Sequence, residues 1–143
     1  PHNYANILWA FLHIDHASDP AALTRAVLEG VTHALRDCFD ALTSTGTHIN
    51  RLIAVGGGSK SDYWVQAIAT SLGMPIELPV SGDFGGAFGA ARLGMMAATG
   101  QGAEIATAPK IARVIEPVAA LGDAFGQAHA RYRASYDAIK GLK

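Results

Sequence analysis

The most informative stretch of the chain is Leu52-Ile53-Ala54-Val55-Gly56-Gly57-Gly58-Ser59-Lys60-Ser61-Asp62-Tyr63-Trp64. A short apolar run ends at three glycines and is followed by large side chains at helical spacing, which predicts a strand, a tight turn and a helix. Such a unit presents backbone N–H groups at a helix N-terminus, where a phosphate can bind. Glycine leaves room for the phosphate and tolerates positive φ. The alternative is a tight turn without a ligand, and the motif alone leaves both interpretations open.

Two common nucleotide-binding motifs do not fit this turn. The P-loop requires a glycine directly before its lysine, and here Ser59 stands before Lys60. The dinucleotide fingerprint requires a third glycine at the position of Ser61. A phosphate site at this turn would therefore have a different design.

The composition indicates a single folded domain. Of the 143 residues, 50% are hydrophobic and 16% are charged, which argues against disorder. The net charge of -1, without a basic run, makes nucleic acid an unexpected partner. No apolar run reaches the length of a membrane span. The single cysteine, Cys38, excludes a disulfide within the chain and fits a reducing, cytoplasmic setting, and its helical apolar surroundings predict a core position.

Helices and strands alternate along the chain, which predicts an α/β fold. We expect helices at about 20–44, 61–72, 85–99 and from Pro117 onward, with strands at 51–55, 76–80 and 111–115, the last at a sheet edge. Ser18 or Asp19 can cap the first helix, and Asp83 the third. The small residues of the third helix predict close packing against another element. The first helix has an apolar stripe of Leu23, Val27, Val31, Leu35, Cys38 and Leu42.

No catalytic or metal-binding set follows from the residues themselves. The six histidines are scattered, and no cysteine or carboxylate cluster completes a ligand set with His13 and His16. No nucleophile motif is present. Asp62 has two open interpretations: a helix-capping carboxylate at the positive end of the helix dipole, or a polar contact to a bound nucleotide.

Four ordered segments resemble the C-terminal part of the FGGY carbohydrate kinases. They are the helix containing 26–31 and 34–37, the glycine turn 55–64, the glycine-rich segment 82–94 and the terminal segment 132–136. The resemblance implies that residues 1–143 form an actin-like, ribonuclease-H-type ATPase domain of the α/β class. This domain would be the C-terminal half of a two-domain sugar kinase.

This resemblance also implies a site and a reaction. The backbone of Gly57 and Gly58 would meet the α-phosphate region of ATP, Ser61 belongs to the same motif, and Asp62 would contact the adenosine. The γ-phosphate of ATP, with Mg²⁺, would pass to a ketopentose, most closely to the 5-hydroxyl of D-xylulose. The catalytic aspartate and the sugar pocket would lie in a preceding N-terminal domain, so we expect this chain to be inactive alone.

Alternatives remain open at this point. Another FGGY kinase, such as a gluconokinase, ribulokinase or glycerol kinase, would share these motifs. A non-catalytic actin-like module that binds nucleotide is a further possibility. We also expect a homodimer, because Trp9, Phe11 and the last helix offer apolar surface.

Overall fold

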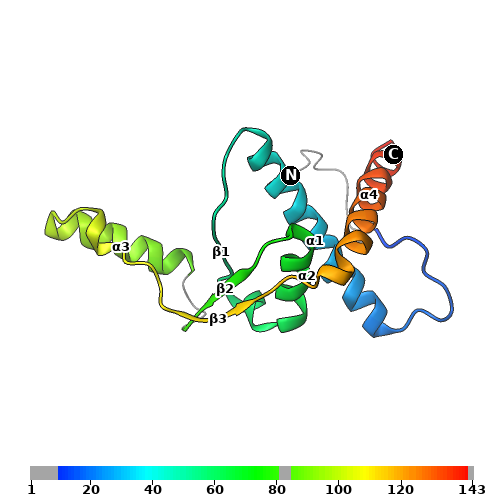
Figure 1. The fold of residues 1–143 in the computed structure, drawn as a ribbon, viewed down its shortest axis with the longest axis horizontal. Coiled ribbons are helices and arrows are strands. Elements are labelled where there is room, and N and C mark those ends of the chain that lie inside the picture. Colours follow the sequence, from blue (N-terminus) through cyan, green and yellow to red (C-terminus); the bar gives the residue numbers. More distant parts are fainter. Residues whose placement is uncertain (1–9, 81–84, 142–143) are drawn as a thin grey trace.

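The structure of the chain is a computed structural model, and it describes residues 10–80 and 85–141. The main elements are α1 (Pro20–Ser44), β1 (Leu52–Ile53), α2 (Asp62–Leu72), β2 (Ile76–Pro79), α3 (Gly86–Thr99), β3 (Ile111–Ile115) and α4 (Gly122–Ile139). Short 3-10 helices, η1 (Gly57–Lys60), η2 (Ala103–Ile105) and η3 (Ala119–Leu121), lie between them. The predicted α/β alternation is confirmed (Figure 1).

The three strands form one mixed sheet in the order β1-β2-β3. Strand β1 is parallel to β2, with Leu52 opposite Ile76, and α2 connects the two. Strand β3 is antiparallel to β2 and lies at the edge, as predicted. This connection through α2 places the carboxyl end of β1 and the start of α2 at the same end of the sheet.

The core lies between one face of the sheet and α2. Val65 and Ala69 of α2 pack against Ile76 and Leu78 of β2, and all four are buried. Burying each branched side chain of this kind contributes about 2 kcal/mol. The opposite face of the sheet is open among the described residues, where Val114 is 46% exposed.

Helix α1 begins where the sequence predicts, and Asp19 rather than Ser18 is its N-cap. The Asp19 carboxylate accepts a hydrogen bond of 2.7 Å from the N–H of Ala22. The Ser18 hydroxyl instead bonds to the side chain of Asp15. Proline at the first turn is compatible with this start because its missing N–H would have no partner there.

The inward face of α1 is polar, which the apolar stripe did not predict. Its buried residues are Thr32 and His33, whereas Leu35 and Leu42 are 40% and 54% exposed. Cys38 is exposed, so the expected core position is wrong. The reason is that polar side chains of α1 face α2 and α4, so that Leu35, Cys38 and Leu42 point outward, while Leu23, Val27 and Val31 are half-buried.

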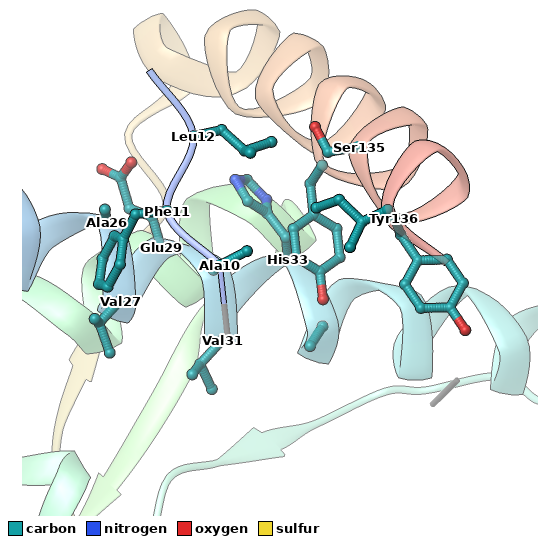
Figure 2. A pocket seen from close by; sticks show the side chains of 14 residues that line it. Ala10, Phe11, Leu12, Ala26, Val27, Glu29, Val31, His33, Ser135 and Tyr136 are labelled. Atoms are coloured by element: carbon teal, nitrogen blue, oxygen red, sulfur yellow. The ribbon is translucent and has the colours of Figure 1, made fainter. Parts of the chain in front are cut away.

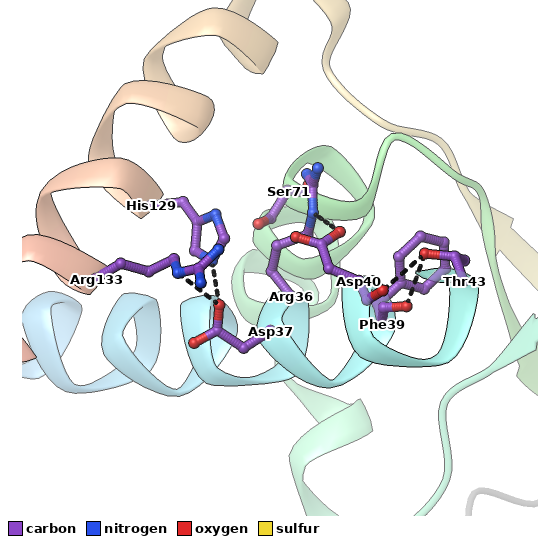
Figure 3. A network of polar contacts seen from close by, with 8 residues as sticks. All are labelled: Arg36, Asp37, Phe39, Asp40, Thr43, Ser71, His129 and Arg133. Atoms are coloured by element: carbon purple, nitrogen blue, oxygen red, sulfur yellow. Dashed lines mark hydrogen bonds and ion pairs between the residues drawn. The ribbon is translucent and has the colours of Figure 1, made fainter. Parts of the chain in front are cut away.

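A buried polar contact joins helix α4 to α1. His129 Nε2 lies 2.8 Å from Asp37 Oδ1, with both side chains nearly inaccessible, and Arg133 approaches the same oxygen to 3.8 Å (Figure 3). The helix begins at Gly122, five residues later than expected from Pro117, because η3 comes first. The N–H of Val118, the residue directly before η3, donates a hydrogen bond to the Thr70 hydroxyl of α2.

Helix α3 lies well apart from α1, α2 and α4 (Figure 1). It has no buried residue, and added side-chain atoms at Gly86, Gly89 or Gly94 would meet nothing within 4 Å. Within the described residues the expected close packing of this helix is therefore wrong. Its N-cap residue is Gly85, and Asp83 lies outside the described residues.

Candidate functional site: the glycine turn

The glycine turn lies between β1 and α2 and is fixed by its own hydrogen bonds. Gly56 adopts φ +85°, which confirms the expected positive φ at this turn. Both the N–H and the hydroxyl of Ser59 donate to the Gly56 carbonyl, at 3.2 and 2.7 Å. Ser59 is buried on the inner side of the turn, whereas Gly57 and Gly58 are exposed.

Gly57 offers an open approach to the backbone. It is exposed, and a Cβ placed on it would have no neighbour within 4 Å. As the first two residues of η1, Gly57 and Gly58 carry N–H groups that the helix does not use for its own hydrogen bonds. Two donors on an uncovered glycine backbone are suited to the oxygens of an anion.

Gly58 is required for a different reason. A Cβ on Gly58 would lie 2.4 Å from Cζ3 of Trp64 and 3.0 Å from Cε3. The indole ring therefore lies directly against the Gly58 backbone. The absence of a side chain at Gly58 accommodates a neighbour within the protein and is not in itself a sign of a ligand.

Ser61 caps α2, and Asp62 is paired. The Ser61 hydroxyl accepts a hydrogen bond of 3.3 Å from the N–H of Trp64. The carboxylate of Asp62 accepts two hydrogen bonds from the guanidinium of Arg113 on β3, one of them at 3.0 Å. These bonds lower the pKa of the exposed Asp62 carboxyl. Capping thus belongs to Ser61, while Asp62 connects the start of α2 to the edge strand.

Helix α1 supports the turn through two further hydrogen bonds. Trp64 Nε1 donates to the fully buried hydroxyl of Thr32 at 3.1 Å. The Tyr63 hydroxyl donates to Glu29 Oε1 at 2.8 Å. Neither Thr32 nor Arg113 was predicted from the sequence as part of this site. A threonine beside an apolar stripe was the available signal for the first, and no local signal existed for the second, which is 51 positions from Asp62.

A separate hollow lies between α1, α4 and the segment before α1. It measures about 510 Å³ and is mostly apolar, with walls that include Phe11, Val27, Val31 and Tyr132 (Figure 2). None of the four predicted binding residues, Gly57, Gly58, Ser61 or Asp62, lines it. His33 lines its floor and is buried, and burial lowers the pKa of its imidazole.

Within residues 10–80 and 85–141, no three side chains of His, Cys, Asp or Glu come together as a metal-binding group. No helix there has the length and apolar character needed to traverse a membrane.

The first two thirds of the chain match the sequence pattern of a known protein family. The pattern of the FGGY family of carbohydrate kinases, C-terminal domain, matches residues 1–98. The chain belongs to this family. The predicted fold, an α/β actin-like ATPase domain, is confirmed by the family and by the mixed helix and sheet architecture.

Three relatives of this FGGY chain are informative. A xylulose kinase of Escherichia coli (strain K12) is 37% identical over 111 residues, covering 78% of this chain and 23% of that protein. The crystal structure of a xyloylose kinase from Brucella ovis matches all of this chain and 30% of that one, at 54% identity and TM-score 0.87. The xylulose kinase from Rhodospirillum rubrum matches 92% of this chain and 27% of that one, at 26% identity and TM-score 0.75. The FGGY chain therefore spans less than a third of the length of these relatives.

Proposed function

We propose that this chain is the ATP-binding part of a sugar kinase that transfers the γ-phosphate of ATP to D-xylulose, forming D-xylulose 5-phosphate. The relatives described above, named as xylulose kinases, support the substrate. The observation that carries the proposal is the uncovered backbone at Gly57, in the turn between β1 and α2. A cytoplasmic setting, where ATP is available, is part of the proposal.

Each predicted residue has a role in this proposal. The N–H groups of Gly57 and Gly58 bind phosphate oxygens, and the N-terminus of α2 adds favourable potential. Ser61 keeps that terminus in place by capping it. Asp62, held by Arg113, would repel phosphate and so contacts the adenosine instead.

Mg²⁺ belongs to the proposal as a companion of ATP. This ion keeps several waters and binds through one or two carboxylates plus substrate phosphates. The open turn at Gly57 leaves room for a hydrated ion on the phosphates. When bound, it would neutralise charge on the transferred group.

The remainder of the reaction needs groups outside this chain. The 5-hydroxyl oxygen of the sugar attacks the γ-phosphorus, the bond to the β–γ bridging oxygen breaks, and ADP leaves. The hydroxyl proton passes to a carboxylate base that we assign to an N-terminal domain, together with the sugar pocket. The catalytic contribution of this chain is to hold ATP in line with the acceptor.

The full-length protein tests the proposal. Phosphate transfer from ATP is measured with D-xylulose, D-ribulose, gluconate and glycerol as acceptors. We expect D-xylulose to give the highest kcat/KM, and the present chain alone to give no transfer. A higher kcat/KM for another acceptor would reassign the substrate within the family. Binding of ATP without transfer to any acceptor would instead favour a non-catalytic nucleotide-binding module.

We further propose that exposed apolar surface brings two copies of the isolated chain together as a homodimer. The stripe on α1 that includes Leu35 and Leu42 supports this, as does the exposed Phe11 beside the hollow of Figure 2. Trp9, the other residue predicted for this surface, lies outside the described residues. Unpartnered apolar area of this kind favours association in water.

A further inference from the structure

The buried hydroxyl of Thr32 links α1 to the glycine turn. It donates a hydrogen bond of 2.9 Å to the carbonyl of Leu28 and accepts one of 3.1 Å from Nε1 of Trp64. The side chain is 0% exposed. A hydroxyl has one proton to donate and lone pairs to accept with, so both functions are used here. Valine has the same shape and could provide neither bond.

The indole of Trp64 continues this link to Gly58. Its Nε1 edge bonds to Thr32, and its six-membered ring lies against the Gly58 backbone, where a Cβ would be 2.4 Å from Cζ3. The orientation of the ring therefore sets the space beneath Gly58. A rotated ring would either press on the turn or leave it unsupported.

Two other side-chain hydrogen bonds also join α1 to α2. Glu29 of α1 accepts from the Tyr63 hydroxyl at the start of α2. Arg36 of α1 donates to the carbonyl of Ser71 at its end (Figure 3). These contacts attach both ends of α2. What Thr32 adds is a fixed rotation of one ring beside the turn.

We propose that Thr32 is a positioning residue for ATP. Its hydroxyl orients the indole ring of Trp64. The ring in turn holds the Gly58 backbone in the position in which the N–H groups of Gly57 and Gly58 bind phosphate. This inference rests on the proposed function of the glycine turn. Thr32 itself is fully buried and acts through the indole of Trp64.

The chain offers a matched control for the test. Thr70 of α2 is also buried, donates to the Gln66 carbonyl at 2.7 Å and accepts from the N–H of Val118 at 3.1 Å. Thr70→Val removes the same chemistry as Thr32→Val, but at a bond that joins α2 to the segment before α4. Any general loss of stability should appear in both variants.

The test measures ATP binding and steady-state kinetics in the full-length protein. We expect Thr32→Val to raise the Kd and KM for ATP about tenfold, with kcat and the sugar KM nearly unchanged. Thr32→Ser, which keeps the hydroxyl, should restore both values. Thr70→Val should leave them at the parent level. The indole N–H resonance of Trp64, identified with Trp64→Phe, should shift in Thr32→Val and stay in place in the other two variants.

Two failures remain distinguishable. If the parent binds ATP and Gly57→Val loses it, while Thr32→Val binds as the parent does, the positioning role is wrong and the site stands. An equal loss of affinity in Thr70→Val would also overturn the role, since the effect would then be general. If the parent binds no ATP, or Gly57→Val binds as the parent does, the proposed site itself fails.

Discussion

The indole ring of Trp64 occupies the space that a side chain on Gly58 would need. The ideal Cβ position lies 2.4 Å from Cζ3 of the ring, well inside any tolerated carbon–carbon distance. Trp64 is in turn held by Thr32. Two adjacent glycines of one motif therefore serve different purposes, because Gly58 accommodates the protein and Gly57 faces open space.

We predict that Gly58→Ala destabilises the chain by about 1–3 kcal/mol, since the added carbon overpacks the contact with the ring. Urea unfolding measures the free energy of unfolding. Gly58→Ala should lower the free energy of unfolding less when it is added to the variant Trp64→Leu than when it is added to the parent. A stability of Gly58→Ala equal to that of the parent would show that the ring moves aside without penalty.

The N-cap of α1 provides a second prediction. Asp19→Ala should lower the free energy of unfolding by about 1 kcal/mol, because the N–H of Ala22 loses its acceptor. Ser18→Ala is the matched control and should have a smaller effect, since the Ser18 hydroxyl bonds to Asp15 and not to the helix. Equal losses in both variants would contradict the assignment of the cap.

The pH dependence of stability should include a contribution from His33. Burial is the main cause that lowers its pKa from the usual 6.5, and the charge of His129 acts in the same direction, against Glu29 and Asp37. The unfolded chain then binds more protons below about pH 6.5, so the free energy of unfolding falls as the pH is lowered through that value. Above that pH this contribution to stability is fully present.

The variant His33→Phe isolates this contribution. Phenylalanine suits a position beside the rings of Phe125 and Tyr132 and carries no proton to titrate. Urea midpoints at about pH 7.5 and about pH 5 should differ less in the variant than in the parent. The same difference in both proteins would show that His33 does not contribute.

Self-association should depend on the outward stripe of α1. At high concentration, light scattering should give a mass above that of a monomer for the isolated chain, and Leu35→Lys/Leu42→Lys should reduce it. Leu93→Lys, at an exposed leucine of α3 and outside the surface proposed for the dimer, serves as the control. A monomeric parent would contradict the proposed homodimer.

Local signals in the sequence predicted most of the elements and less of their packing. Asp19, Pro20 and the glycines located the helix ends and the turn, because capping and positive φ are local requirements. The inward face of α1 was wrongly predicted, since it is fixed by its bonds to Tyr63 and Trp64, far along the chain. The apolar stripe of α1 pointed to the opposite face.

The candidate site was predicted in the same uneven way. Gly57 and Gly58 stand out in the sequence as equal members of a triplet, and their different surroundings appear only once Trp64 is placed. The pairing of Asp62 with Arg113 depends on β3 lying beside β2, a relation between distant segments. Such contacts have no local signature.

Calorimetric titration of the full-length protein with ATP is the most direct measurement of whether ATP binds at the Gly57 backbone. Gly57→Val places a side chain where the structure has open space, so the fold should be unaffected while the phosphate is excluded. We predict that the parent binds ATP and that Gly57→Val binds at least tenfold more weakly, with an unchanged unfolding midpoint. ATP binding by Gly57→Val at the affinity of the parent would contradict this prediction.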